Sequence, residues 1–537
     1  MAYQELRRLE FETLKLLFEM HQISMIDAFI MVKSEQFYGI EIEDFPCQVA
    51  QLSMVLMKHL MDREMSDYFG INIIEFPIRE SATIVRGNAL RIDWNEVCTA
   101  ERLNYIIGNP PFIGYSMQSN EQKEDILSVF LDRKGKAIKT AGKIDFVAGW
   151  YYKAAQYMQG TAIRAAFVST NSITQGDQVA PIWGTIIPLF GIKIDFAYRT
   201  FKWGNEAKAN AAVHCVIIGF SPQSTYAGTK YIFDHGISFE VMRINPYLVE
   251  ADNVFIASRS KPLNNIPQMI TGNRPVDGGH LIIEAREYEE FVNSEPDALK
   301  YIKKMIGSKE FINGLDRYCL WLVGVSPKEI RQMPKVLERV DNVRKARLSS
   351  PDAGARALAD TPTLFREIYN PESAIVIPLV SSENRRYVPI GFIDSNTITT
   401  NLIGLIPNAT LFHFGILTSN VHMAWMRTVA GRLEMRYRYS KDIVYNNFIW
   451  PDCTPAQKEK IEQTAQGILD ARANYPNDSY ADLYDDTVMP PDLRRAHQAN
   501  DRAVWEAYGR AWPIGDEAAC VAHLMRLYQE KTVECTK

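Results

Sequence analysis

The first part of the chain alternates short apolar runs with helical patterns, and this alternation constrains the fold more than any other feature of the sequence. Apolar runs of strand type cover residues 37–42, 105–107 and 163–168. Apolar residues at helical spacing lie between them, over residues 46–60 and 146–159. Strands that alternate with helices build a mostly parallel sheet with helices on its faces. We therefore predict an α/β fold for this part.

Two further apolar runs end this part of the chain, and the character of the sequence then changes. Residues 192–198 and 213–220 predict strands, whose short connection would allow an antiparallel pair at an edge of the sheet. Proline and glycine punctuate residues 261–280, which marks loops and a boundary. Short strands and helices are then mixed as far as Pro451, and the chain becomes helical from Pro455. The predicted parts are an α/β domain over 1–225, a linker over 226–265, an α+β domain over 266–451 and a helical region over 452–537.

The length and composition are those of an ordinary folded protein with several domains. A chain of 537 residues is too long for one core, and 47% hydrophobic with 23% charged residues excludes a disordered or fibrous protein. The net charge of −5 gives no support for nonspecific coating of nucleic acid, although basic residues could still gather on one face. The seven cysteines are scattered without a CxxC pair, so neither a disulfide framework nor a metal site is indicated. Since no membrane span or signal peptide is recognisable, we expect a cytoplasmic protein with no membrane partner.

The sharpest motif is Asn109-Pro110-Pro111-Phe112, which directly follows the strand predicted at 105–107. In open parallel sheets, ligands bind at the carboxyl ends of strands, so the motif lies where a site is expected. The two prolines stiffen the loop and hold its polar groups in place. A rigid turn alone would need neither the phenylalanine nor the asparagine before the prolines.

These residue types suit chemistry on a planar exocyclic amine. Such an amine has two N–H donors and a lone pair delocalised into its ring, and two acceptors that pull on the hydrogens draw the nitrogen toward a nucleophilic, tetrahedral state. The side-chain oxygen of Asn109 and the backbone carbonyl of Pro110 could supply these acceptors. Phe112 offers a face on which an extruded base can stack. No nucleophilic cysteine is needed, because transfer from a sulfonium methyl can be direct.

Two weaker signals precede this motif. Glu41 ends an apolar strand, where an acidic side chain suits hydrogen bonds to ribose hydroxyls. A helix-capping or solvent-facing glutamate would fit the same pattern. Asn88, within Gly87-Asn88-Ala89-Leu90, could hydrogen-bond an adenine amino group, or it could be an ordinary loop asparagine.

Together the motifs resemble those of class I adenine-N6 DNA methyltransferases in which the target-recognition domain comes last. The series is Tyr38-Gly39-Ile40-Glu41-Ile42, Gly87-Asn88-Ala89-Leu90, Asn109-Pro110-Pro111-Phe112 and Ser169-Thr170-Asn171-Ser172. The later part of the chain is similar to the single-chain, bifunctional restriction–modification enzymes of type IIL, through residues 272–279, 381–387 and 431–440.

The resemblance implies a Rossmann-like methyltransferase domain, a DNA target-recognition domain and a helical C-terminal region. It further implies S-adenosylmethionine as cofactor, double-stranded DNA as partner, and methylation of adenine N6 after base flipping, as part of a restriction–modification system. The implied roles are catalysis for Asn109, Pro110, Pro111 and Phe112, cofactor binding for Glu41, Ile42, Asn88 and Ala89, and DNA recognition for Arg385, Arg386, Glu434, Arg436 and Arg438.

The sequence departs from the family pattern at one point. Such enzymes carry an acidic-Pro-x-x-Gly-x-Gly loop after their first strand, and no stretch of this sequence has that pattern. Residues 3–10 resemble the helix that follows such a loop. We therefore expect the loop, the first strand and any nuclease domain on an upstream segment or another polypeptide. Two alternatives stay open: a DNA-recognition fragment without catalysis, and methylation of another planar amine, such as cytosine N4, RNA or protein glutamine.

Overall fold

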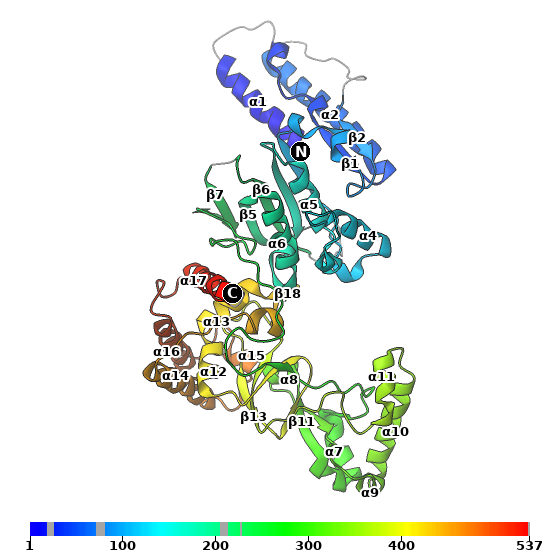
Figure 1. Ribbon diagram of the computed structural model, residues 1–537, viewed down its shortest axis with the longest axis vertical. Coiled ribbons are helices and arrows are strands. Elements are labelled where there is room, and N and C mark those ends of the chain that lie inside the picture. Colours follow the sequence, from blue (N-terminus) through cyan, green and yellow to red (C-terminus); the bar gives the residue numbers. More distant parts are fainter. Residues whose placement is uncertain (19–25, 71–80, 205–212, 226–227, 535–537) are drawn as a thin grey trace. The chain divides into compact units, whose positions relative to one another are not determined.

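The computed structural model describes residues 1–18, 26–70, 81–204, 213–225 and 228–534 (Figure 1). They cluster into two compact units, the first made of 1–169, 185–196 and 217–229, the second of 170–184, 197–216 and 230–537. The predicted order of an α/β part, an α+β part and a helical C-terminal part is confirmed. Within the described ranges, no helix is both long and apolar enough to cross a membrane.

Two long helices open the chain and pack against each other. α1 (Ala2–Phe18) confirms the helix predicted there, whereas α2 (Asp44–Phe69) is longer than the helix predicted at 46–60. The buried guanidinium of Arg7 on α1 pairs with the carboxylate of Asp62 on α2 at 2.7 Å. The apolar spacing continues through Met61, Met65 and Phe69, which the predicted end at residue 60 leaves out.

A two-stranded parallel sheet accompanies these helices. β1 (Tyr38–Glu41) pairs with β2 (Thr83–Arg86), with Glu41 opposite Arg86 at the carboxyl end. The Gly87 N–H then donates to the Glu41 carbonyl at 2.8 Å. The pairing therefore brings Glu41 and the turn after β2 to the same end of the sheet.

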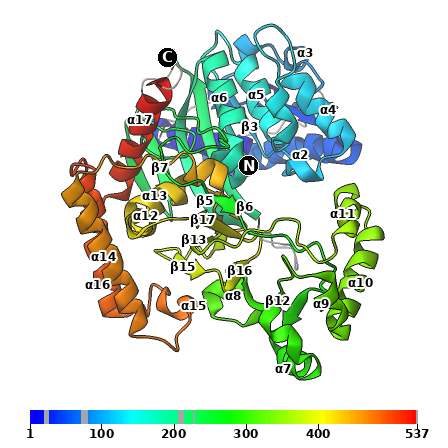
Figure 2. The same cartoon turned by 60° about the horizontal axis from the view of Figure 1, so that its bottom comes forward.

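A six-stranded sheet forms the rest of the α/β part, and Figure 2 shows most of its strands. Its strand order is β3 (Tyr105–Gly108), β4 (Arg164–Thr170), β6 (Val213–Pro222), β5 (Ile192–Trp203), β7 (Lys230–Asp234) and β8 (Ile237–Val241). β3 and β4 are parallel, with Tyr105 opposite Arg164 and Gly108 opposite Phe167. β3 therefore lies at one edge of this sheet, and β8 lies at the other.

Two sequence predictions are wrong here. β5 and β6 do not lie at an edge, because the β7–β8 hairpin follows them, and the stretch 226–265 expected to be a plain linker holds that hairpin. Its two turn residues, His235 and Gly236, have φ values of 48° and 82°. Both central positions of a tight type I′ turn need positive φ, which the usual Asn-Gly or Asp-Gly pair would signal. His-Gly lacks that signature.

Helices α4 (Asn120–Val129) and α5 (Ala148–Tyr157) belong to the same part of the chain. α5 carries Tyr151, whose buried ring lies 5.1 Å from the ring of Phe167 and 5.4 Å from that of Phe220. Its hydroxyl group lies 2.6 Å from Ser169 Oγ. These contacts fix α5 against β4 and β6.

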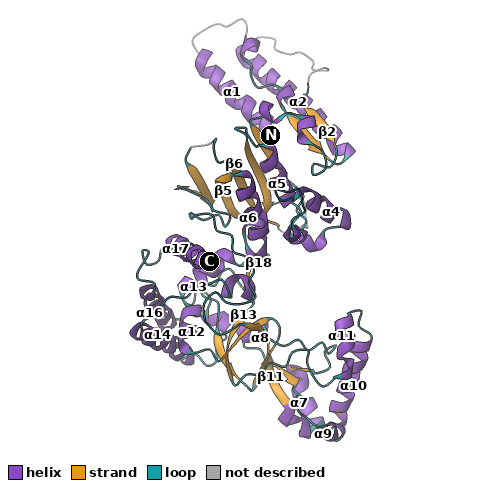
Figure 3. Ribbon diagram, viewed as in Figure 1, coloured by secondary structure: helices purple, strands orange, loops and turns teal. Residues whose placement is uncertain are grey.

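The middle part of the chain contains three small sheets, drawn in orange in Figure 3. The first has the order β10 (Ile282–Glu284), β12 (Arg317–Leu320), β11 (Ile302–Ile306), β16 (Thr397–Thr399). The second has the order β15 (Gly391–Asp394), β13 (Ser373–Pro378), β17 (Ile403–Pro407), β9 (Ile270–Thr271). The third has the order β14 (Val380–Ser381), β19 (Arg436–Arg438), β18 (Gly431–Leu433).

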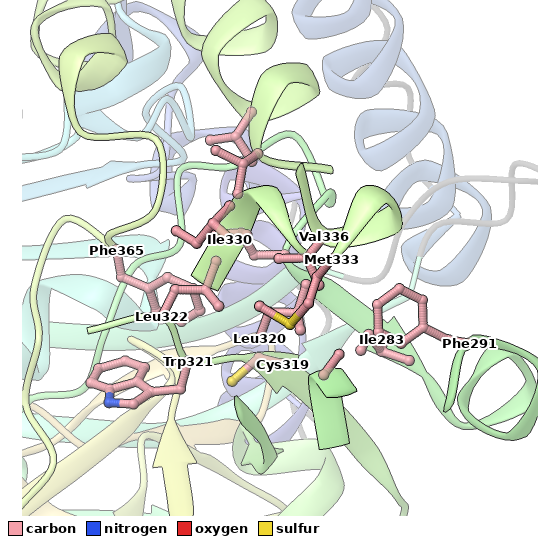
Figure 4. Packing of buried hydrophobic residues seen from close by; sticks show 14 of the residues in the cluster. Ile283, Phe291, Cys319, Leu320, Trp321, Leu322, Ile330, Met333, Val336 and Phe365 are labelled. Atoms are coloured by element: carbon pink, nitrogen blue, oxygen red, sulfur yellow. The ribbon is translucent and has the colours of Figure 1, made fainter. Parts of the chain in front are cut away.

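One apolar cluster holds the first of these sheets against short helices. Figure 4 shows Leu320 of β12 together with Met333 and Val336, and with Phe291 of α7 (Ala285–Ser294). Val336 belongs to α10 (Pro334–Leu348). Sheet and helices therefore share one core.

A buried arginine organises the loops of this part. Arg347 of α10 donates hydrogen bonds to five backbone carbonyls, those of Pro275, Val276, Leu358, Thr361 and Leu364, at 2.7 to 3.0 Å. A planar guanidinium carries five N–H donors, so one side chain can satisfy carbonyls from two loops at once. The Gly-Pro-rich stretch after 272 is thus fixed without regular structure.

Helices make up most of the remaining chain. They are α12 (Leu411–Thr418), α13 (Asn420–Val429), α14 (Pro455–Ala473), α15 (Tyr480–Leu483), α16 (Pro491–Ala507) and α17 (Glu517–Glu534). α14 and α16 lie side by side in both Figures 1 and 2. A Cβ on Gly415 of α12 would come within 2.6 Å of the Ile461 side chain of α14, so this glycine permits close helix packing.

Candidate functional site

The loop after β3 presents Asn109 to solvent. Asn109 and Pro111 are exposed, Phe112 is half-buried, and Pro110 is buried. Among the described residues, no group hydrogen-bonds to the Asn109 side chain or to the Pro110 carbonyl. Both acceptors predicted from the sequence are therefore without a hydrogen-bond partner among the described residues, and the Asn109 side chain is exposed.

The residues after this motif are tied to the start of α5. The Ile113 N–H donates to the Pro111 carbonyl at 3.2 Å, and the Ile113 carbonyl accepts from Phe146 N–H at 2.9 Å. The buried carboxylate of Asp145 accepts from Tyr115 N–H at 3.0 Å. Asp145 is not among the residues predicted from the sequence, where its only signal is an acidic residue between two apolar ones just before a helix.

At the carboxyl end of β1, Glu41 is engaged locally. Its Oε1 accepts from Glu43 N–H at 3.1 Å, just before α2 begins, and Ile42 is exposed. The contact is a local one before the helix and does not cap α2, whose N-cap residue is Glu43. It occupies one carboxylate oxygen and leaves the other without a partner among the described residues.

Asn88, at the carboxyl end of β2, is also held by neighbours. Its Oδ1 accepts from Leu90 N–H at 2.9 Å, and its Nδ2 donates to Asp125 Oδ2 at 2.9 Å. The carbonyl of Ala89 accepts from Trp94 Nε1 at 2.9 Å. The Asn88 side chain therefore shapes its own turn, and a second lone pair on Oδ1 and the second N–H of Nδ2 are left for a ligand.

Asp125 of α4 is a residue that the sequence did not point to. Its nearly buried carboxylate accepts from Asn88 Nδ2 and, at 2.6 Å, from Arg91 Nε. It lies 37 residues from Asn88 in the chain, so no local spacing links the two. A cavity of about 460 Å³ lies beside this turn, lined in part by Leu90 and Lys153, but none of the predicted site residues lines it.

The predicted recognition residues Glu434 and Arg436 lie on the β18–β19 hairpin. Both are exposed, and their side chains pair at 2.9 Å. Glu434 has a φ of 59°, which is uncommon for a residue other than glycine and strains the tip. Arg438 is exposed further along β19. Strain at an exposed polar tip is typical of binding sites.

Arg385 and Arg386 lie in the loop that follows β14. Arg386 is exposed and Arg385 is half-buried, and burial lowers the pKa of the Arg385 guanidinium. β14 pairs with β19, with Val380 opposite Arg438 and Ser381 opposite Tyr437. The structure therefore joins the loop and the hairpin in one three-stranded sheet.

The predicted residues fall into three groups. The β1–β2 pairing joins Glu41 with Asn88, and the β14–β19 pairing joins the two arginines of the loop with the hairpin. Asn109 follows β3, which belongs to a different sheet from β1 and β2.

β3 also has an exposed apolar face. Tyr105 is 64% exposed and Ile107 is 66% exposed, although a parallel strand is normally covered on both faces. The strand pairs with β4, and it has no partner on its other side within the described residues. This edge is therefore able to take a further strand.

The chain is similar to known DNA-modifying proteins over nearly all of its length. It matches the DNA-methyltransferase domain of MmeI over residues 1–234, the MmeI target recognition domain over 250–452 and the MmeI C-terminal domain over 453–535. The chain is also similar to the solved structure of the type IIL restriction–modification enzyme MmeI in complex with DNA, with 44% sequence identity and a TM-score of 0.87. The match covers 99% of this chain and 71% of the MmeI chain.

A second relative is DNA methyltransferase A of Bacillus subtilis (strain 168). It is 41% identical over 539 residues, which cover 99% of this chain. The chain spans 60% of the length of that relative.

Proposed function

The chain belongs to the family of the type IIL restriction–modification enzyme MmeI, and from this premise we propose that it forms the methylating and DNA-reading part of a restriction–modification system. In the proposed reaction, a methyl group passes from S-adenosylmethionine to N6 of an adenine in duplex DNA. Such an enzyme would act in the cytoplasm, where its DNA lies.

One observation carries this proposal. The Asn109 carboxamide is exposed at the end of β3 and has no partner among the described residues. Together with the Pro110 carbonyl, it would accept the two amino hydrogens of an adenine and make its nitrogen more nucleophilic. Because two prolines fix the loop, the acceptors need little reorganisation when the base arrives.

The target base has to leave the duplex to reach these acceptors. The half-buried ring of Phe112 offers a stacking face for the flipped base. The bond from Tyr115 N–H to the Asp145 carboxylate holds the residues that follow the motif.

The cofactor site fits the described residues in part. The unpartnered carboxylate oxygen of Glu41 would accept from ribose hydroxyls, and Ile42, Asn88 and Ala89 would border the adenine end. S-adenosylmethionine, when bound, supplies the electrophilic methyl group. No glycine-rich loop in the sequence would cradle its methionine end.

We further propose that a segment outside these 537 residues supplies that loop on an additional parallel strand. The exposed edge and face of β3 support this, and so does the division of the parallel strands into a two-stranded and a six-stranded sheet. A strand between β1 and β3 would join the two sheets and cover Tyr105 and Ile107.

For DNA recognition, the exposed side chains of the second half provide suitable groups. Arginine can bind guanine with two hydrogen bonds, and glutamate can accept from the cytosine amino group. We assign base contacts to Glu434 and Arg436, and base or phosphate contacts to Arg385, Arg386 and Arg438.

The test is transfer of labelled methyl groups from S-adenosylmethionine to DNA by a chain extended with the loop and strand. Digestion of the product to nucleosides then distinguishes N6-methyladenine from N4-methylcytosine, and RNA and protein serve as competing substrates. Asn109→Ala should lower transfer by at least about 100-fold, the usual loss when one such polar group is removed. The matched control is Asn104→Ala, at the exposed start of the same strand. Equal rates for the two variants would refute the assignment.

A second candidate function is DNA recognition without catalysis. The exposed edge of β3 favours it for the chain as it stands, because the methionine end of the cofactor has no cradle. It predicts sequence-selective DNA binding with no heat of S-adenosylmethionine binding in calorimetry.

A further inference from the structure

Both proposed DNA-reading elements meet one arginine, Arg427 of α13. Its side chain is 17% exposed. Nη1 donates to the Arg386 carbonyl at 2.8 Å, within the loop that follows β14. The backbone carbonyl of Arg427 accepts from Arg432 Nη2 of the hairpin at 3.2 Å. One residue thus touches the loop through its side chain and the hairpin through its main chain.

Arg427 is itself held from the C-terminal helices. Its Nε and Nη2 donate to the two carboxylate oxygens of Glu517 on α17, at 2.8 and 2.7 Å. Nη2 also donates to Asn420 Oδ1 at 2.9 Å. Four donor contacts therefore fix the plane of the guanidinium, which a lysine ammonium could not reproduce.

The hairpin is braced by the arginine that contacts Arg427. Arg432 Nη1 donates to the Met435 carbonyl at 3.1 Å, and its guanidinium lies 4.0 Å from the centre of the Tyr437 ring. These contacts lie directly behind the strained tip that carries Glu434 and Arg436.

A second anchor fixes the residue after Arg386. The hydroxyl group of buried Tyr387 donates to Asp501 Oδ2 on α16 at 2.6 Å, and its ring stacks on that of His497 at 4.2 Å. Asp501 Oδ1 accepts from Asn420 N–H at 2.7 Å, and Asn420 also contacts Arg427. The exposed Arg386 side chain therefore projects from a backbone that is held on both sides.

We propose that Arg427 is a positioning residue that fixes the Arg386 loop and the Glu434 hairpin in one relative geometry, and that Glu517 makes α17 part of DNA recognition. Arg427 contacts no base in this scheme, because four of its five N–H donors bind protein groups and its side chain is mostly buried. The inference rests on the proposed function in so far as these two elements read DNA.

The test uses hydrogen–deuterium exchange of the full chain and DNA selection from random duplexes. In Arg427→Lys, amide exchange of residues 382–387 should rise by about tenfold, because the loss of charged hydrogen bonds eases local opening. Exchange of residues 431–438 should rise less, because the Arg427 carbonyl that accepts from Arg432 is kept. Exchange in α14 should not change. The preference for the selected duplex over a random one should fall by about tenfold, while nonspecific binding keeps its affinity and salt dependence.

Arg526→Lys is the matched control, because this arginine lies on the same helix as Glu517 and is exposed. Unchanged exchange in the loop and the hairpin of Arg427→Lys would overturn the inference. If Arg427→Lys fails to fold, Glu517→Gln removes the charge of the Arg427–Glu517 pair, and the same exchange measurement is made on that variant. If exchange rises as expected but the wild type selects no sequence, the positioning role stands and the proposed function fails.

Discussion

The loop after β3 and the β18–β19 hairpin both present exposed polar side chains, but their supports differ. The hairpin pairs with β14 and is braced by Arg432 and Arg427. Within the described part of the chain, the strand that leads to Asn109 pairs on one side only, and it exposes the apolar face of Tyr105 and Ile107. The residues proposed for recognition are thus supported by described neighbours, whereas those proposed for chemistry follow a strand with an exposed face.

Two long helices show the same difference between an exposed and a covered apolar face. α2 exposes apolar side chains at helical spacing, and Phe45, Leu52 and Leu56 are each more than half exposed. On α14 the corresponding apolar face, with Ile461 and Ile468, is fully buried. Apolar spacing alone shows which face a helix would bury, and only the neighbouring elements decide whether that face is covered.

The largest effect should come from removing the guanidinium that supports the recognition part. Arg347→Met removes five hydrogen bonds and leaves the carbonyls of Pro275, Val276 and Leu364 without a donor among the described residues, so we expect a loss of about 4 kcal/mol in the stability of this part. Urea unfolding, monitored by amide hydrogen exchange of residues 272–279, would measure this loss of stability. Arg344→Met, on the exposed side of the same helix, should cost less than about 0.5 kcal/mol. A similar cost for both would show that the carbonyl contacts contribute little.

Acid should also destabilise the recognition part. Burial lowers the pKa of His422 from 6.5 to about 3. The neutral ring is therefore favoured in the folded state, and its stabilisation is present above pH 6.5 and is lost as the pH falls toward 3. Between pH 6.5 and pH 4 the loss is about 3 kcal/mol.

Urea unfolding at a series of pH values would measure this loss. His422→Gln removes the titration and should flatten the pH profile over that range. Parallel profiles for wild type and variant would contradict the assignment.

A smaller effect concerns DNA selectivity rather than folding. Glu434→Gln keeps the size of the side chain and removes its charge, so folding stability should change by less than about 0.5 kcal/mol. Discrimination at one base pair should change by about 1–3 kcal/mol, measured by selection from random duplexes. Glu459→Gln, on the exposed face of α14, should select the same sequences as the wild type. The same outcome for Glu434→Gln would remove this residue from the base contacts.

The sequence predicts the elements well and their long-range supports poorly. Alternating apolar patterns locate β3 and α5, and the Pro-Pro motif places Asn109 at an exposed strand end. Arg427 and Glu517 lie 90 residues apart, so no periodicity connects them. Asp125 likewise pairs with a distant turn, and a buried acid resembles a surface acid when only its neighbours in sequence are seen.

The smallest effect expected in these 537 residues tests most directly whether a further strand covers β3. Ile107→Thr changes an exposed side chain, so it should cost less than about 0.5 kcal/mol in these 537 residues. In a chain extended with the proposed strand, Ile107 would be buried, and the same change should cost about 1–2 kcal/mol. Ile375→Thr, on the buried strand β13, should cost the same in both chains. Thermal unfolding of the four variants measures the difference, and an equal cost of Ile107→Thr in both chains would mean that nothing covers β3.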